Sequence, residues 1–277
     1  LNQIPKKFLV TELLIGYVAL TVILVIFVWF QDPTEYLKFN EVTNAFNYPY
    51  TPIGMNKNTY SFILVTAAMS CVTMIKLKKS FYIYSFLLII FTVIVLFLQT
   101  RSHLPLMLAI WLWLIGFSKK NIIFAIPVFV TFIAVGSLFF DYVYFIYSRS
   151  SDSIRFTMSV MSLIEFLNNP LIGNGAAATI KQVQSFSTSD HNQFTLFAGY
   201  FGILGLIPMA FFIWYICQSF RGLGVINCFL LSSTFIIAIS FTPFIYNLGC
   251  LVALCGVRLI DYGTINDLTD KKQLSNL

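Results

Sequence analysis

Charged side chains are scarce in this sequence. Only 10% of its 277 residues are Asp, Glu, Lys or Arg, and 58% are hydrophobic; a soluble domain carries roughly 25% charged residues. This is too little polar surface to cover a water-exposed globule, so we expect the bilayer to be the solvent for most of the chain. The net charge of +6 then indicates no nucleic-acid partner, because Lys and Arg in a membrane protein mainly mark its cytoplasmic loops.

Several common catalytic and metal-binding motifs are also missing. There is no G-x-S-x-G, no Walker loop, no H-E-x-x-H and no D-x-D pair. The five cysteines form no C-x-x-C pair and lie in or at the ends of apolar runs, which is typical of small core side chains. We expect no metal and no cofactor. Any glycosyl or phosphoryl transfer would then use positive side chains to bear the charge of an anion.

Long apolar runs dominate instead. A membrane-spanning helix needs about 20 apolar residues, and the sequence contains about eight such candidates. We therefore predict an all-α fold, a polytopic transmembrane helix bundle forming one integral membrane domain over residues 1–277, the C-terminal portion of a longer protein. The predicted spans are 8–30, 59–76, 81–98, 99–118, 122–140, 194–217, 225–241 and 244–260.

The basic residues predict the orientation of these spans. With the N-terminus in the cytoplasm, eleven Lys and Arg residues fall inside and six outside, in accord with the positive-inside rule. Both ends of the chain are then cytoplasmic, and loops 31–58 and 141–193 face outward. The second loop is the longest polar segment, and connections of that length are more often functional than passive.

The outward loop 141–193 contains a short periodic segment. Residues 155–167 carry apolar side chains at helical spacing over a stretch too short to span a bilayer. We predict an amphipathic helix lying on the outer membrane surface. Its apolar positions are Phe156, Val160, Leu163, Ile164 and Leu167.

The fourth span raises a question of length. Its uninterrupted apolar part is 104–117. At a rise of 1.5 Å per residue, a helix of this length is shorter than the hydrocarbon core, which is about 30 Å thick. Extension back to Gln99 supplies the missing length and brings Arg101 and His103 into the outer end of the helix. An arginine at that depth is a functional hypothesis. The alternative is that Arg101 reaches out to lipid phosphates, and charge alone does not separate the two.

The stretch DHNQ, 190–193, begins a later span. Asp190 suits an N-cap and Gln193 follows as in a capping box, so His191 would be the first helical residue. The helix dipole and any nearby arginine keep its imidazole neutral, which a general base requires. The alternative is a plain polar cap at the membrane surface. Small residues below His191 leave space for a neighbouring helix or a ligand: Thr195, Ala198, Gly199 and Gly202.

Three outward-facing residues could form one site. The guanidinium groups of Arg101 and Arg155 suit a diphosphate, because a planar fork donates two hydrogen bonds and stays charged. His191 suits general-base chemistry, because its unperturbed pKa is near 6.5. The intervening NPLIGNG, 169–175, has two glycines that permit a tight turn or a close backbone approach, although a plain loop is the better explanation of this motif on its own.

The order of these motifs resembles a known family. LQTRSHLPLML is followed by SIRFTMSVMSLIEFLNNPLIGNG and then by DHNQFTLFAGYFGILGLIPMAFF. This is similar to the bacterial O-antigen ligase and polymerase family, which includes capsular and exopolysaccharide polymerases. Arg155 stands 15 residues before Pro170, and His191–Asn192 precede a Gly-x-x-Gly. The segment 54–64 is also similar, so the resemblance covers roughly residues 50–220.

The resemblance implies a metal-independent, inverting membrane glycosyltransferase of the C type in the bacterial plasma membrane. Its donor would be a glycan on undecaprenyl diphosphate, and its active site would be extracytoplasmic. Arg101 and Arg155 would hold the diphosphate, and His191 would take the proton of the attacking hydroxyl or orient it. Further substrate contacts are expected from Arg149, Asn192, Gly173 and Gly175. Two features depart from the family: it usually has ten or more helices, and His103 stands where a small or apolar residue is commoner.

Three functions fit these observations. The first is polymerisation of lipid-linked repeat units, with the flippase and chain-length regulator of the same pathway as partners beside the lipid bilayer. The second is an O-antigen ligase, which differs only in transferring the glycan to a lipid A core. The third is a transporter of lipid-linked sugars. Transporters carry charged residues deep in several helices, whereas the polar groups here cluster at the outer ends. This pattern favours an enzyme over a transporter. Between the two enzymes we favour the polymerase, because members of the family with weak motif matches are more often polymerases.

Overall fold

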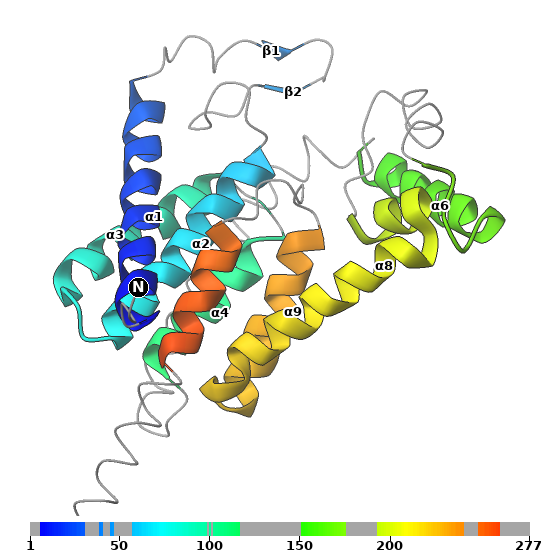
Figure 1. Cartoon of the computed structure of the whole chain (residues 1–277). Helices are drawn as coiled ribbons and strands as arrows, with labels where there is room; N and C mark the ends of the chain where they lie inside the picture. Colours follow the sequence, from blue (N-terminus) through cyan, green and yellow to red (C-terminus); the bar gives the residue numbers. More distant parts are fainter. Residues whose placement is uncertain are drawn as a thin grey trace, which may run out of the picture.

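The structure is a computed structural model of the whole chain. It describes residues 6–30, 39–40, 45–46, 57–98, 100, 102–116, 151–175, 193–240 and 249–260. Apart from one antiparallel pair of two-residue strands, β1 (Phe39–Asn40) and β2 (Ala45–Phe46), these segments are helices joined by turns (Figure 1). The helices are α1 (Lys6–Trp29), α2 (Lys57–Lys76), α3 (Phe81–Leu98), α4 (Leu104–Ile115), α6 (Ser151–Asn168), α8 (Gln193–Phe220), the 3₁₀ helix η2 (Arg221–Leu223), α9 (Val225–Ser240) and a C-terminal helix, Gly249–Ile260.

Four of these helices are long and apolar enough to cross a membrane, which supports the predicted membrane protein. They are Phe8–Trp29, Asn58–Lys76, Phe81–Leu98 and Phe194–Leu223. Three further predicted spans coincide with shorter apolar helices, Leu104–Ile115, Val225–Ser240 and Gly249–Ile260. The predicted span 122–140 lies outside the described residues.

The helix α4 begins later than the predicted span 99–118. The backbone carbonyl of Thr100 accepts hydrogen bonds from the amides of His103 at 2.9 Å and Leu104 at 3.2 Å, so the chain turns before the helix starts. Pro105 then occupies one of the first two helical positions, where its missing N–H costs nothing and its fixed φ suits a helix. Thr100, Ser102 and His103, which were predicted to enter the membrane with α4, therefore belong to the turn before that helix, and Arg101 lies outside the described residues.

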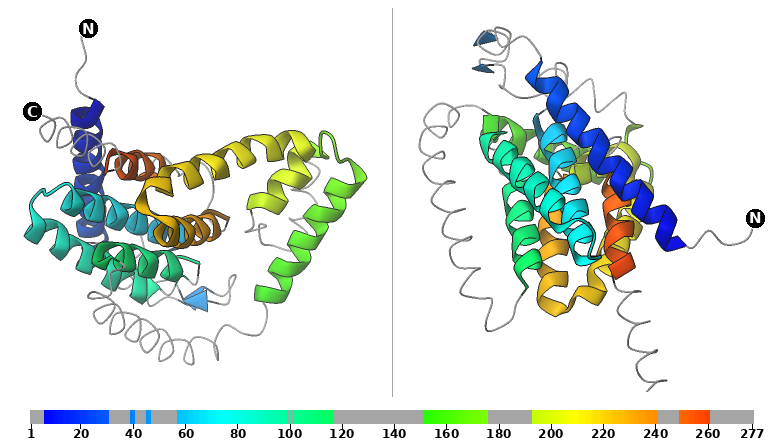
Figure 2. Two further views of the ribbon diagram at one scale, coloured as in Figure 1. Left: turned by 90° about the horizontal axis from the view of Figure 1, so that it is seen from below. Right: turned by 90° about the vertical axis from the view of Figure 1, so that its left-hand side faces the viewer.

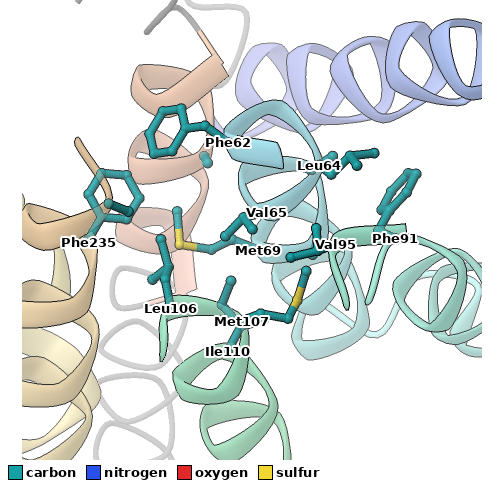
Figure 3. Close-up of a cluster of buried hydrophobic side chains, with 14 of the residues drawn as sticks. Phe62, Leu64, Val65, Met69, Phe91, Val95, Leu106, Met107, Ile110 and Phe235 are labelled. Atoms are coloured by element: carbon teal, nitrogen blue, oxygen red, sulfur yellow. The ribbon is translucent and has the colours of Figure 1, made fainter. Parts of the chain in front are cut away.

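The helix α2 lies at the centre of the bundle and packs against α1, α3 and α4. Figure 3 shows Phe62, Val65 and Met69 of α2 facing apolar side chains of α3, α4 and α9. Buried hydroxyls along α2 are satisfied within the helix, since Ser70 and others donate to a carbonyl one turn earlier. The Tyr17 hydroxyl bonds the Thr66 hydroxyl at 2.6 Å and joins α1 to α2.

The helix α8 joins the bundle to α6. Its 28 residues would extend about 42 Å as one straight helix, more than the hydrocarbon core of about 30 Å. A kink at Gly202, with φ 60° and ψ −147°, divides it. The part before the kink packs against α6, and the part after it returns to the bundle beside α9 (Figures 1 and 2). The segment after the kink, 203–220, is then the part that matches the bilayer thickness.

The helix α6 covers the segment predicted to be an amphipathic helix, but its buried face is the small and polar one. Ser162 and Glu165 are buried, whereas Leu163, Ile164 and Leu167 are 44%, 50% and 71% exposed. In a water-soluble protein we would expect the apolar side chains of α6 to face α8, because burial removes them from water. An outward apolar stripe is the arrangement expected of a helix that lies in a membrane interface.

Candidate functional site

The helix α6 and the first turns of α8 lie side by side and run in the same direction (Figure 2). The carbonyl oxygen of Ser162 lies 3.0 Å from the position that a Cβ on Gly199 would take. Further along both segments, the carbonyl of Pro170 accepts a hydrogen bond from the amide of Ile203 at 2.8 Å. Later residues of one segment thus meet later residues of the other, which defines a parallel pair.

The parallel register fixes which part of α6 lies level with the start of α8. Gln193, the first residue of α8, is six positions before Gly199. The same step back from Ser162 along α6 reaches Phe156, about 9 Å away at 1.5 Å per residue. Arg155 stands seven positions, two helical turns, before Ser162 and so occupies the same side of α6.

The predicted site residues are described to different extents. His191 and Asn192 directly precede Gln193 and lie outside the described residues, as do Arg101 and Arg149. For Arg155 the helical backbone is described but the side chain is not. The structure thus brings the segment of α6 that carries Arg155 to the level at which α8 begins.

The small residues at the start of α8 accommodate protein backbone. A Cβ on Gly202 would stand 2.6 Å from the Pro170 carbonyl oxygen, and one on Gly199 would contact Ser162. Of the two occupants left open by the sequence, a neighbouring helix or a ligand, the structure places α6 and the loop 169–175 beside these two glycines. Gly173 packs in the same way, since its Cβ would meet the Tyr200 carbonyl group at 2.5 Å.

Gly175 differs from Gly173. It has φ 76° and would have nothing within 4 Å of a Cβ. Both glycines were predicted to contact substrate. The packing explains why Gly173 needs no side chain, and among the described atoms none lies near a Cβ on Gly175. The substrate contact predicted for both glycines stays a hypothesis.

The loop 169–175 replaces hydrogen bonds that the kink interrupts. In a continuous helix the Ile203 amide would donate to the Gly199 carbonyl. Here Ile203 donates to Pro170, and the Gly199 carbonyl accepts from the Asn174 amide at 3.0 Å. Buried backbone groups must be paired, most of all where lipid offers no substitute. The loop and the kink therefore form one structural unit, which the sequence does not reveal because neither segment shows it alone.

The turn before α4 is the second candidate element. The hydroxyls of Ser61 and Thr100 form a buried hydrogen bond that ties this turn to the first residues of α2. The ring of His103 is fully buried, lies 5.7 Å from that of Phe62, and its Nδ1 is 3.2 Å from the Ser102 hydroxyl. Residues on both sides of Arg101 are thus held against the start of α2. In Figure 1 this end of α2 and α6 both lie in the upper half of the molecule.

Burial also determines the charge of His103. It lowers the pKa of this imidazole to about 3, so the ring is neutral at physiological pH. His103 therefore adds no positive charge beside Arg101. Among the side chains that the structure describes, no group of three or more His, Cys, Asp or Glu could hold a metal ion.

Comparison with known proteins finds no match, whether with protein-family models, with curated proteins or with solved structures.

Proposed function

We propose that this chain is a membrane glycosyltransferase that polymerises undecaprenyl-diphosphate-linked repeat units into a surface polysaccharide. The proposal includes about eight spans, cytoplasmic termini and an extracytoplasmic loop 141–193 that contains α6. The observation that carries it is the parallel packing of α6 and α8, because it brings the backbone at Arg155 level with the helix that follows His191. The resemblance of the three motifs to O-antigen ligases and polymerases supplies the substrate class.

The proposed reaction needs one base and one anion site. A sugar hydroxyl of the acceptor unit attacks the anomeric carbon of the donor glycan, and the bond from that carbon to the diphosphate oxygen breaks. His191 takes the hydroxyl proton. Arg101 and Arg155 bear the charge of the departing lipid diphosphate, which a forked guanidinium can do without a metal ion.

The buried side chains favour surface chemistry over transport. Among the described residues, the only buried members of the set Asp, Glu, Lys, Arg and His are His103 and Glu165. The first lies in the turn before α4, and the second lies in α6, which packs on α8 and not in the central bundle. A route for a charged lipid-linked sugar would need polar groups along the bundle interior. In α2 the buried hydroxyls of Thr66, Ser70 and Thr73 instead donate to carbonyls of their own helix.

The test replaces His191 with Ala in the native strain and resolves the surface glycan by size. We expect single repeat units without a ladder, because chain extension needs the base. Arg155→Lys should also reduce extension, since it keeps the charge but loses the fork. Its matched control is Arg221→Lys at an exposed position of η2, which should leave the ladder unchanged.

Two outcomes would separate the alternatives. A full ladder in the His191→Ala strain at normal protein level would contradict the proposed base. Long chains that accumulate on the carrier lipid and never reach a lipid A core would indicate the ligase instead, because polymerisation would then be intact.

A further inference from the structure

Glu165 carries a buried carboxyl group, in a chain that has few carboxyl groups of any kind. It lies in the last turns of α6 and is only 8% exposed, next to the fully buried Ser162. Removing a carboxyl group from water is costly unless hydrogen bonds replace the lost hydration. The side chain of Glu165 must therefore have a specific partner.

That partner is Asn174 in the loop 169–175. The Asn174 side-chain amide donates to Oε2 of Glu165, and its Oδ1 accepts from the side-chain amide of Asn169. The backbone amide of Asn174 donates to the Gly199 carbonyl. One residue thus bonds the end of α6, its own loop and the first part of α8.

The chemistry of this position requires an amide side chain. An aspartate at 174 would still accept from Asn169, but it could not donate to Glu165 and would place two carboxylates together. An apolar residue could do neither. The next backbone bond along the chain, from Ile203 to Pro170, holds the segment just after the kink. The Glu165–Asn174 pair therefore ties the end of α6 to the loop residue whose backbone amide bonds α8.

We infer that Glu165 and Asn174 are positioning residues that hold the start of α8 against α6 and thereby set Arg155 and His191 relative to each other. The inference rests on the proposed function. Ten residues separate Glu165 from Arg155 along α6, about 15 Å in a helix, so the pair acts through the helices and not on the substrate. A displacement of about 1 Å in an active site can cost on the order of a hundredfold in rate.

The test exploits the polarity of the hydrogen bond. Asn174→Asp should lower kcat for chain extension at least tenfold while the donor KM changes little, because the reacting groups move and the donor contacts remain. Glu165→Gln should be mild, since its carbonyl oxygen still accepts from Asn174. The double variant Glu165→Gln with Asn174→Asp reverses donor and acceptor, and kcat should return to within about threefold of the parent protein. Hydrogen exchange of the Asn174 and Ile203 amides, measured on the same full-length preparations, reports whether the junction is formed.

Three results would overturn the inference. The first is an Asn174→Asp protein with parental kcat. The second is a double variant no more active than Asn174→Asp alone. The third is a double variant whose amide exchange recovers while kcat does not, which would make the pair purely structural. His191→Ala is measured in parallel: an active His191→Ala protein defeats the proposed function itself, whereas an inactive one beside a fully active Asn174→Asp protein defeats only the positioning role.

Discussion

Replacement of Gly202 by alanine tests whether the kink in α8 depends on glycine. The backbone there, at φ 60° and ψ −147°, belongs to a region that costs other residues about 1–3 kcal/mol. A Cβ would also stand 2.6 Å from the Pro170 carbonyl oxygen and the Leu171 carbonyl carbon, whereas packed carbon atoms prefer about 3.5–4.0 Å. The loop must then move away from α8, so we expect a local cost of about 2 kcal/mol or more.

The assay is hydrogen exchange of the backbone amides that cross the junction. A cost of about 2 kcal/mol raises the population of the open junction roughly thirtyfold. The amides of Asn174, Ile203 and Leu204 donate across it and should exchange faster by about that factor in Gly202→Ala. Amides in the middle of α2 should be unchanged, because that helix packs in the bundle and not on the loop.

Two glycines serve as controls. Gly224 has φ 85° but nothing within 4 Å of a Cβ, so Gly224→Ala adds backbone strain at the η2–α9 turn and no clash. Gly16 has neither problem in the middle of α1, and Gly16→Ala should stabilise that helix by roughly 0.5–1 kcal/mol. If Gly202→Ala exchanges at the parental rate, or if Gly224→Ala loosens the junction equally, the kink does not depend on the glycine at 202.

Three further predictions concern the bundle, each measured by unfolding in detergent. Lys78 has φ 58° after α2, so Lys78→Gly should stabilise by about 1 kcal/mol while Lys79→Gly does not; equal effects would contradict this. Ser61→Ala removes the buried hydrogen-bond partner of Thr100 in the turn before α4 and should cost about 1–3 kcal/mol. The control Ser233→Ala should cost little, because its hydroxyl donates to carbonyls of its own helix. The pKa of His103 is lowered to about 3, so below about pH 6.5 the unfolded chain binds a proton that the folded chain does not. Stability should then fall by up to about 1.4 kcal/mol per pH unit, and the part due to His103 should vanish in His103→Asn.

Apolar length predicts most of the helices because lipid demands continuous apolar runs. The predicted span 81–98 matches α3 at both ends, and 225–241 ends one residue beyond α9. The start of α4 is different, because hydrophobicity alone does not reveal that Thr100 closes a turn. Pro105 is the signal in the sequence that favours the later start.

The sequence predicts less of the candidate site than of the fold. The periodic stripe of α6 predicts an amphipathic helix, but periodicity cannot say which face the protein buries, and the structure buries Ser162 and Glu165. The small residues Gly199 and Gly202 indicate a close approach without naming what approaches. The Glu165–Asn174 bond joins residues from a helix and a loop whose relation depends on the kink. Such contacts follow from tertiary packing, which local pattern does not specify.

The central claim is that this chain extends lipid-linked glycans by metal-independent transfer with His191 as the base. The most direct measurement reconstitutes the purified protein with the native repeat unit on undecaprenyl diphosphate, in excess EDTA, and resolves the products by length. The proposed function predicts a ladder of longer glycans, with one lipid diphosphate released for each bond formed, and single units only with the His191→Ala protein. Absence of extension by the parental protein, or the same ladder from His191→Ala, would contradict it.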